Sequence, residues 1–144
     1  MALLALHACS DFDAERLFVS HVTSIPNGGL KNLHGGKVSC LHCPIYFVLD
    51  TGPELVSKIV AEQRLHQVAN LPRDARQVEE LVQKQANWWE QTDLEANDKV
   101  YWIHYNSKRA GLESAFRLLV VKGKRSFFIT SGHFNPAYYE AGDA

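Results

Sequence analysis

Two apolar runs near the C-terminus, joined by one tight turn, restrict this chain to folds that contain an antiparallel sheet. The first run reads AFRLLVV (115–121), the second reads RSFFIT (125–130), and a Lys-Gly-Lys turn separates them. Short runs rich in β-branched and aromatic residues, separated by a few residues that include glycine, are typical of a β-hairpin. The run KVYWIHY (99–105) alternates well enough to predict a third strand.

Earlier in the chain the pattern predicts one further strand and two helices. The segment PIYFVL (44–49) is aromatic and β-branched and predicts a strand. Apolar residues then recur at helical spacing over residues 53–68, and a second helical run covers residues 74–88. The order of strand, helix, helix and three strands favours an α+β fold, with an antiparallel sheet of about four strands and two helices packed on one face.

The N-terminal third of the domain is less regular. Residues 17–22 form a short apolar run that suits either a strand or a short helix, and clusters of proline and glycine at 25–29 and 34–36 predict a loop-rich segment. The chain has 144 residues, of which 46% are hydrophobic and 22% are charged. This length and composition fit one hydrophobic core, so we expect residues 17–144 to form a single domain.

The charge of the chain excludes some classes of partner. Its net charge is −1, whereas general binders of nucleic acid or anionic membranes rely on a large basic excess. The charges are nevertheless unevenly distributed: residues 50–98 hold ten acidic and five basic residues, and residues 99–125 hold seven basic residues and one acidic residue. We therefore expect an acidic middle, a basic C-terminal half and no nucleic-acid partner.

The opening stretch, MALLALHACS, places eight largely apolar residues before Cys9. The segment LHAC (6–9) resembles the lipobox of bacterial lipoproteins, a family in which the signal peptide is cut before a cysteine whose thiol then carries a lipid. The resemblance implies that Cys9 is lipidated, that residues 1–16 are leader and tether, and that the domain is lipid-anchored in the periplasm of the bacterial cell envelope. We expect the start of translation to lie upstream, where a positively charged region would complete the leader. The alternative is a cytoplasmic chain whose Cys9 is packed in the core.

Cys40 and Cys43 have a spacing that serves redox exchange, metal binding or a local disulfide. The pair precedes a predicted strand instead of opening a helix, which argues against a thioredoxin-like site. Pro44 stands where c-type haem attachment would require histidine, and a zinc site would need further ligands such as His34 and His42. In an exported chain we expect a disulfide between Cys40 and Cys43, with buried thiols as the alternative. We expect no metal and no cofactor.

The C-terminal half also contains candidates for acid–base chemistry. His104 and His133 could act as base and acid in a metal-independent nuclease, with Arg117 or Lys108 contacting the phosphate. Two histidines with basic neighbours are a generic pattern, and the sequence contains no nucleophile elbow, zinc-protease motif or phosphate-binding glycine loop. A small nuclease or toxin-like enzyme is therefore the alternative, and we expect no catalysis.

Binding residues are expected on the predicted sheet. Alternation along residues 99–105 puts Trp102 and His104 on one face, and alternation along residues 115–121 puts Arg117 on the face that is normally solvated in such folds. With Arg125 they form the candidate binding set, while the tryptophan pair at 88–89 is expected to belong mainly to the core. We expect a non-enzymatic envelope lipoprotein that binds another protein, as immunity proteins and envelope-assembly accessories do, and that contacts the membrane only through its lipid.

Overall fold

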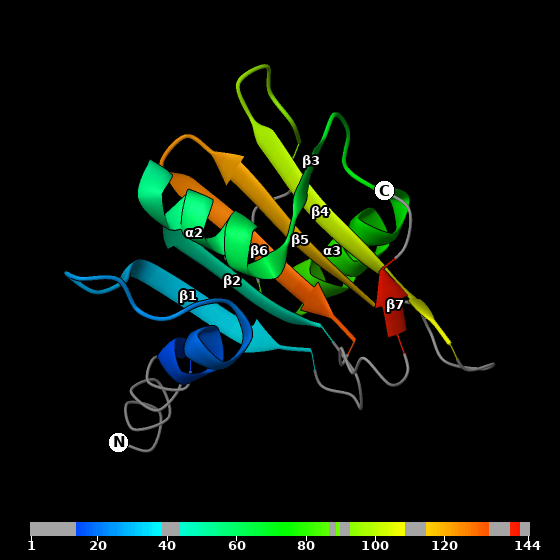
Figure 1. The fold of residues 1–144 in the computed structure, drawn as a ribbon, viewed down its shortest axis with the longest axis horizontal. Helices are drawn as coiled ribbons and strands as arrows, with labels where there is room; N and C mark the ends of the chain where they lie inside the picture. The colour runs from blue at the N-terminus through cyan, green and yellow to red at the C-terminus, as the bar shows by residue number, and fades with distance from the viewer. Residues whose placement is uncertain are drawn as a thin grey trace.

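The computed structural model describes residues 14–38, 44–86, 89, 93–108, 115–132 and 139–141. These residues form an α+β fold with one antiparallel sheet, in which six strands follow the order β1-β2-β6-β5-β4-β3 and β7 pairs with β4 (Figure 1). Residues 14–21 are helical. The remaining elements are β1 (Lys31–Lys37), β2 (Ile45–Asp50), α2 (Pro53–Gln63), β3 (His66–Val68), α3 (Arg73–Gln85), β4 (Lys99–Ser107), β5 (Ala115–Lys122), β6 (Arg125–Ser131) and β7 (Tyr139–Ala141).

The predicted hairpin is confirmed and forms the centre of the sheet. β5 pairs with β6 from Lys122 and Arg125 at the turn to Phe116 and Ser131 at the far end. The turn contains Gly123 at φ 63°, a backbone conformation that glycine adopts without steric cost. β2, the predicted strand at 44–49, pairs with the other side of β6, so strands distant in sequence lie side by side.

The loop predicted around the glycines at 34–36 is instead part of strand β1. A Cβ atom added to Gly35 would lie 2.6 Å from Phe47 Cδ1, and one added to Gly36 would lie 2.6 Å from Tyr46 Oη. These two glycines therefore let large side chains of β2 pass over the β1 backbone. Neither Gly35 nor Gly36 has a positive φ. The prediction that they lie in a loop is therefore wrong.

The two predicted helices are present, but the first ends earlier than expected. α2 ends at Gln63, because Arg64 adopts a left-handed conformation with φ 56° and its backbone N–H donates to the carbonyl of Ala61. His66–Val68 then pairs with β4 as the short strand β3 instead of continuing the helix. The helix of residues 14–21 begins within the segment assigned to the tether, and Ala14 is buried.

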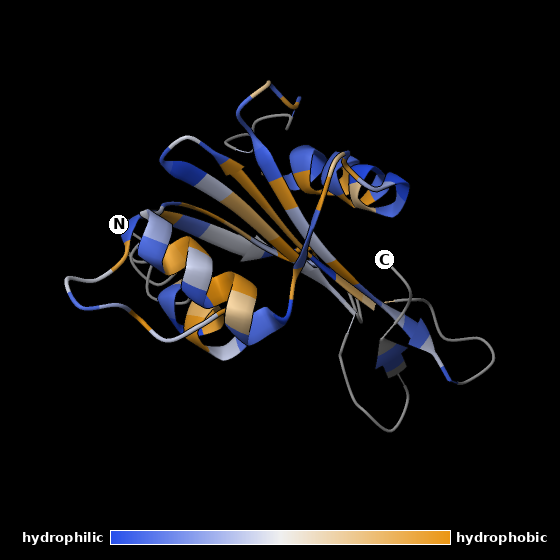
Figure 2. Ribbon diagram, turned by 45° about the horizontal axis from the view of Figure 1, so that its top comes forward, coloured by the Kyte–Doolittle hydropathy of each residue, from blue (hydrophilic) through white to orange (hydrophobic). Residues whose placement is uncertain are grey.

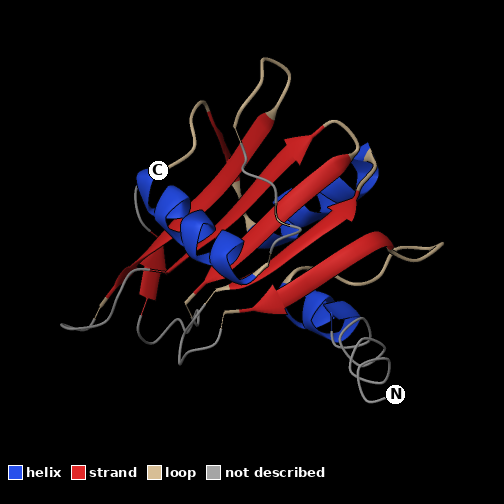
Figure 3. Cartoon of the chain, turned by 180° about the vertical axis from the view of Figure 1, so that it is seen from behind, coloured by secondary structure: helices blue, strands red, loops and turns tan. Residues whose placement is uncertain are grey.

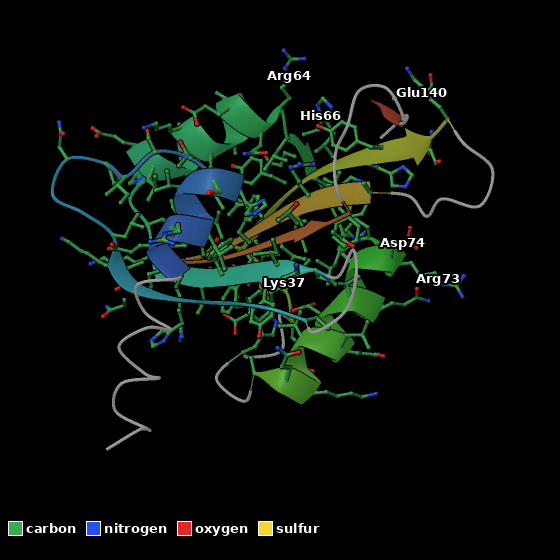
Figure 4. All side chains as sticks on the ribbon, turned by 90° about the horizontal axis from the view of Figure 1, so that it is seen from below. Lys37, Arg64, His66, Arg73, Asp74 and Glu140 are labelled. Atoms are coloured by element: carbon green, nitrogen blue, oxygen red, sulfur yellow. The ribbon has the colours of Figure 1, made fainter. Side chains whose placement is uncertain are left out.

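The sheet is covered on both faces, so the predictions of about four strands and of helices on one face are wrong. α3 packs on one face, against the cluster that contains Trp102 and Leu118. α2 and the helix of residues 14–21 pack on the other face, against the cluster that contains Phe47 and Leu119. Figure 4 shows the sheet nearly edge-on between these helices, and Figure 3, which views the molecule from behind, shows α3 lying across the near face of the sheet.

The cause of this two-sided burial lies in the central strands. Adjacent residues such as Phe127 and Phe128 belong to opposite faces and are both buried. Strands with apolar residues at every position need cover on both sides, as is usual for buried sheets. Figure 2 accordingly shows apolar residues concentrated in the central strands.

Candidate functional site

The structure separates two residues of the predicted nuclease set. His104 lies on the α3 face, where its ring stacks on Trp102 with a centroid distance of 6.1 Å and an interplanar angle of 7°. Arg117 lies on the opposite face, with its guanidinium carbon 5.4 Å from the ring centroid of Tyr105. One phosphate group cannot contact both side chains, because the sheet lies between them. Lys108 is exposed just beyond the end of β4, and His133 lies outside the described residues.

The prediction that Arg117 occupies a solvated face is wrong. Its strand neighbour Leu119 on that face is fully buried in the cluster covered by α2. Burial lowers the pKa of the Arg117 guanidinium below its ordinary value, although Tyr105 opposes this shift. The contact with Tyr105 is a cation–π geometry, which indicates a packing role within the α2 layer.

The four predicted binding residues do not form one surface. Trp102 is buried in the α3 cluster, and Arg117 faces the other side of the sheet. Arg125 shares the α3 face, since its guanidinium carbon lies 5.6 Å from the ring centroid of Phe127. His104, however, is level with Ser131, six residues further along β6 from Arg125. That separation corresponds to about 20 Å along a strand.

The remaining predictions concern the tryptophan pair, the cysteines, metal binding and membrane contact. Trp89 is buried in the core, as expected for one member of the tryptophan pair. Cys9, Cys40, Cys43 and Trp88 lie outside the described residues. In the described part of the chain, no group of three or more His, Cys, Asp or Glu side chains is placed to hold a metal ion. No described helix is both long enough and apolar enough to cross a membrane.

Strand register gathers basic residues at one end of the sheet, a feature that no local sequence pattern indicates. Lys31 of β1 pairs with Asp50 of β2, Asp50 pairs with Arg125 of β6, and Arg125 pairs with Lys122 of β5. Lys99 begins β4 opposite the residue before Lys122. We call this region the basic end, and its members are Lys31, Lys99, Lys122, Lys124 and Arg125. It lies at the end of the sheet where α2 begins and β5 turns into β6 (Figure 1).

A pocket of about 730 Å³ opens at the basic end, on the α2 face of the sheet. Its apolar lining includes Val56 of α2, Tyr101 of β4 and Val121 of β5, which pack against the cluster under α2. Its charged and amide side chains are those of Lys31, Lys99, Lys124, Asp50 and Asn97. The pocket therefore combines an apolar lining with three positive charges and one negative charge.

The acidic groups near the pocket are already engaged. Asp50 Oδ2 accepts a hydrogen bond from Asn32 Nδ2 at 2.6 Å, and Asp98 Oδ2 accepts one from Lys122 Nζ at 2.6 Å. The second contact is an ion pair, which neutralises Lys122. Within the described part of the chain, no ion pair or side-chain hydrogen bond involves the ammonium groups of Lys31, Lys99 and Lys124. These three lysines give the lining of the pocket a net positive charge.

The ion pair between Asp98 and Lys122 predicts a pH-dependent contribution to stability. Burial raises the pKa of the Asp98 carboxyl, but hydrogen bonds from Lys122 and from the backbone N–H of Glu95, together with the Lys122 charge, bring the pKa below its ordinary value of 3.8. A lowered pKa stabilises the folded state above the ordinary value, and the contribution is lost as the pH falls through the lowered pKa. Asp98→Asn should lower the free energy of unfolding by up to about 1 kcal/mol at pH 7.

Urea denaturation at neutral pH and below the ordinary aspartate pKa checks this expectation. The difference between Asp98→Asn and the wild type should shrink as the carboxyl becomes protonated. An equal difference under both conditions would contradict an ionic contribution from Asp98.

Comparison with protein-family models, curated proteins and solved structures found no match.

Proposed function

We propose that this chain is a non-enzymatic binding module, carried on a bacterial envelope membrane by a lipid on Cys9, that recognises an acidic partner protein through its basic end. The observation that carries the proposal is the convergence of Lys31, Lys99 and Lys124 around one pocket from three separate segments of the chain. Complementary charge of this kind steers association and selects partners. The lipid follows from the lipobox resemblance and places the domain beside envelope proteins.

The arrangement of the other candidate residues supports binding over nuclease activity. General acid–base catalysis requires its groups within hydrogen-bond reach of one substrate. His104 and Arg117 lie on opposite faces of the sheet, and His104 stacks on a buried tryptophan. The pocket at the basic end contains lysines, an aspartate, an asparagine and a tyrosine, and none of its lining residues is a histidine or cysteine.

Site-specific photo-crosslinking in intact cells tests the partner surface. Asn97 is exposed and lines the pocket, whereas Gln77 is exposed on α3, which covers the other face of the sheet. A photo-crosslinking amino acid at position 97 should give a discrete adduct with an acidic protein, and the same amino acid at position 77 should not. The adduct should decrease by about tenfold or more when Lys31, Lys99 and Lys124 are all changed to glutamate, because reversed charges repel the partner.

A single charge reversal away from the pocket gives a control for this experiment. Lys84→Glu changes an exposed lysine in the last turn of α3 and should leave the adduct unchanged. Equal adducts from positions 77 and 97, or equal losses from Lys84→Glu and the triple change, would show that the basic end is not the recognition surface.

A further inference from the structure

We infer that the pocket at the basic end is itself a binding site for a small organic anion, a carboxylate attached to an apolar group. This goes beyond the proposed protein partner, because the ligand is a small molecule held inside the pocket.

The charge of the pocket selects an anion. Lys31, Lys99 and Lys124 contribute three positive charges to the lining, against one negative charge from Asp50. Asp50 accepts a hydrogen bond from Asn32, so its carboxylate already has a donor outside the pocket lining. Lysine ammonium groups act as compact point charges that approach a ligand oxygen from several directions, because the side chain is flexible. β1 and β4 are separated by β2, β6 and β5 in the sheet, a distance of about 19 Å at roughly 4.8 Å per strand. A carboxylate bound near β4 can therefore contact Lys99 and Lys124, while Lys31 adds positive charge to the same lining.

The apolar lining of the pocket favours a carboxylate that carries an aliphatic or aromatic group. Val56, Tyr101 and Val121 are half-buried, come from three different elements, and belong to the apolar layer between α2 and the sheet. An inorganic anion would leave these side chains in contact with water, whereas an aliphatic or aromatic group would cover them. Removing apolar surface from water favours binding. The organic part of the ligand therefore contributes affinity that the lysines alone cannot supply.

The size of the pocket matches a small molecule. Its volume of about 730 Å³ falls within the range of roughly 300–1,000 Å³ that is usual for sites of small ligands and cofactors. Such sites are mostly apolar with a few convergent polar groups, which describes this lining. The tyrosine hydroxyl and the amide of Asn97 add neutral hydrogen-bonding groups beside the lysines.

The pocket lies within the surface proposed to bind the acidic partner protein, so the partner protein and the small organic anion would share a binding site. A folded partner protein and a small anion would both contact the lysines that line the pocket. The two should therefore compete, and the small anion would weaken the protein contact.

Nuclear magnetic resonance titration of the purified full-length protein tests this inference without any partner protein. The probe is 4-phenylbutyrate, and the matched controls are its neutral amide and acetate, which lack the charge and the apolar group respectively. With 4-phenylbutyrate we expect chemical-shift changes confined to amides around Gly52, Val56, Tyr101 and Val121. The amide and acetate should each bind at least about fivefold more weakly, a difference of roughly 1 kcal/mol.

Variants in which a lysine is replaced by neutral glutamine test whether the lysines bind the carboxylate. Lys99→Gln and Lys124→Gln should each weaken 4-phenylbutyrate binding about two- to fivefold, and Lys84→Gln on α3 should not change it. Equal binding of the acid and its amide, equal binding of acetate, or shifts spread over other lysine-bearing surfaces would each overturn the inference. Absence of binding with an intact crosslink from position 97 would overturn the small-molecule site alone and leave the protein partner as the ligand of the basic end.

Discussion

Replacing Trp89 by alanine is expected to lower the free energy of unfolding by about 3–5 kcal/mol, among the largest effects of any single change in this chain. Trp89 is only 4% exposed, although it lies beyond the end of α3. Its ring makes edge contacts with Tyr46 at 5.8 Å and with Phe127 at 5.1 Å between centroids. Its indole N–H donates to Glu79 Oε1 at 3.1 Å. The change would leave a cavity under α3 and remove a donor from a buried carboxylate.

Urea denaturation of Trp89→Ala, Trp89→Phe and Leu81→Ala measures this effect. Trp89→Phe retains an aromatic ring and should recover part of the loss. Leu81 is 48% exposed on α3, so Leu81→Ala should change stability by less than about 0.5 kcal/mol. A loss below about 1 kcal/mol for Trp89→Ala would contradict its assignment to the core.

The second large effect is expected at Phe47, on the opposite face of the sheet. Phe47 is fully buried, and its ring makes an edge contact with Phe18 at 5.6 Å and an interplanar angle of 85°. Phe18 belongs to the helix of residues 14–21, so this contact attaches that helix to β2. Phe47→Ala should cost about 3–5 kcal/mol, because it removes a large ring from a packed layer.

A double-mutant cycle with Phe18→Ala separates the helix contact from the rest of the loss. The coupling energy between the two phenylalanines should be about 0.5–1.5 kcal/mol. Val19→Ala is the control, since Val19 lies in the same helix and is 48% exposed. Additive effects of Phe18→Ala and Phe47→Ala would show that the helix does not pack on β2.

The parts of the fold that were predicted correctly have strong local signals. β5, β6 and their turn are specified by adjacent residues, and α3 shows apolar residues at helical spacing from Ala75 to Val82. β1 was missed because its glycines serve close packing against Phe47 and Tyr46, which are far along the chain. The second covered face could have been recognised from the uninterrupted apolar runs LLVV and FFI, since a strand with one solvated face would alternate.

The candidate site could not be predicted from local sequence. Lys31, Lys99 and Lys124 are separated by at least 25 residues, and they line one pocket only because strand register brings β1, β4 and the β5–β6 turn to the same end of the sheet. The asymmetry of charge along the chain gave a partial signal. It indicated a basic C-terminal half. It did not indicate that Arg117 would pack in the layer between α2 and the sheet. Nor did it indicate that three lysines would line a pocket.

The proposed function depends most directly on the proposed lipid at Cys9, because that lipid would place the domain among envelope proteins. The decisive measurement is the intact mass of the protein, expressed with its native upstream region and recovered from the membrane fraction, with and without reduction. We expect a chain that begins at Cys9 with a lipid adduct and that gains two hydrogens on reduction of a Cys40–Cys43 disulfide. An unprocessed chain without lipid, recovered outside the membrane fraction, would contradict it.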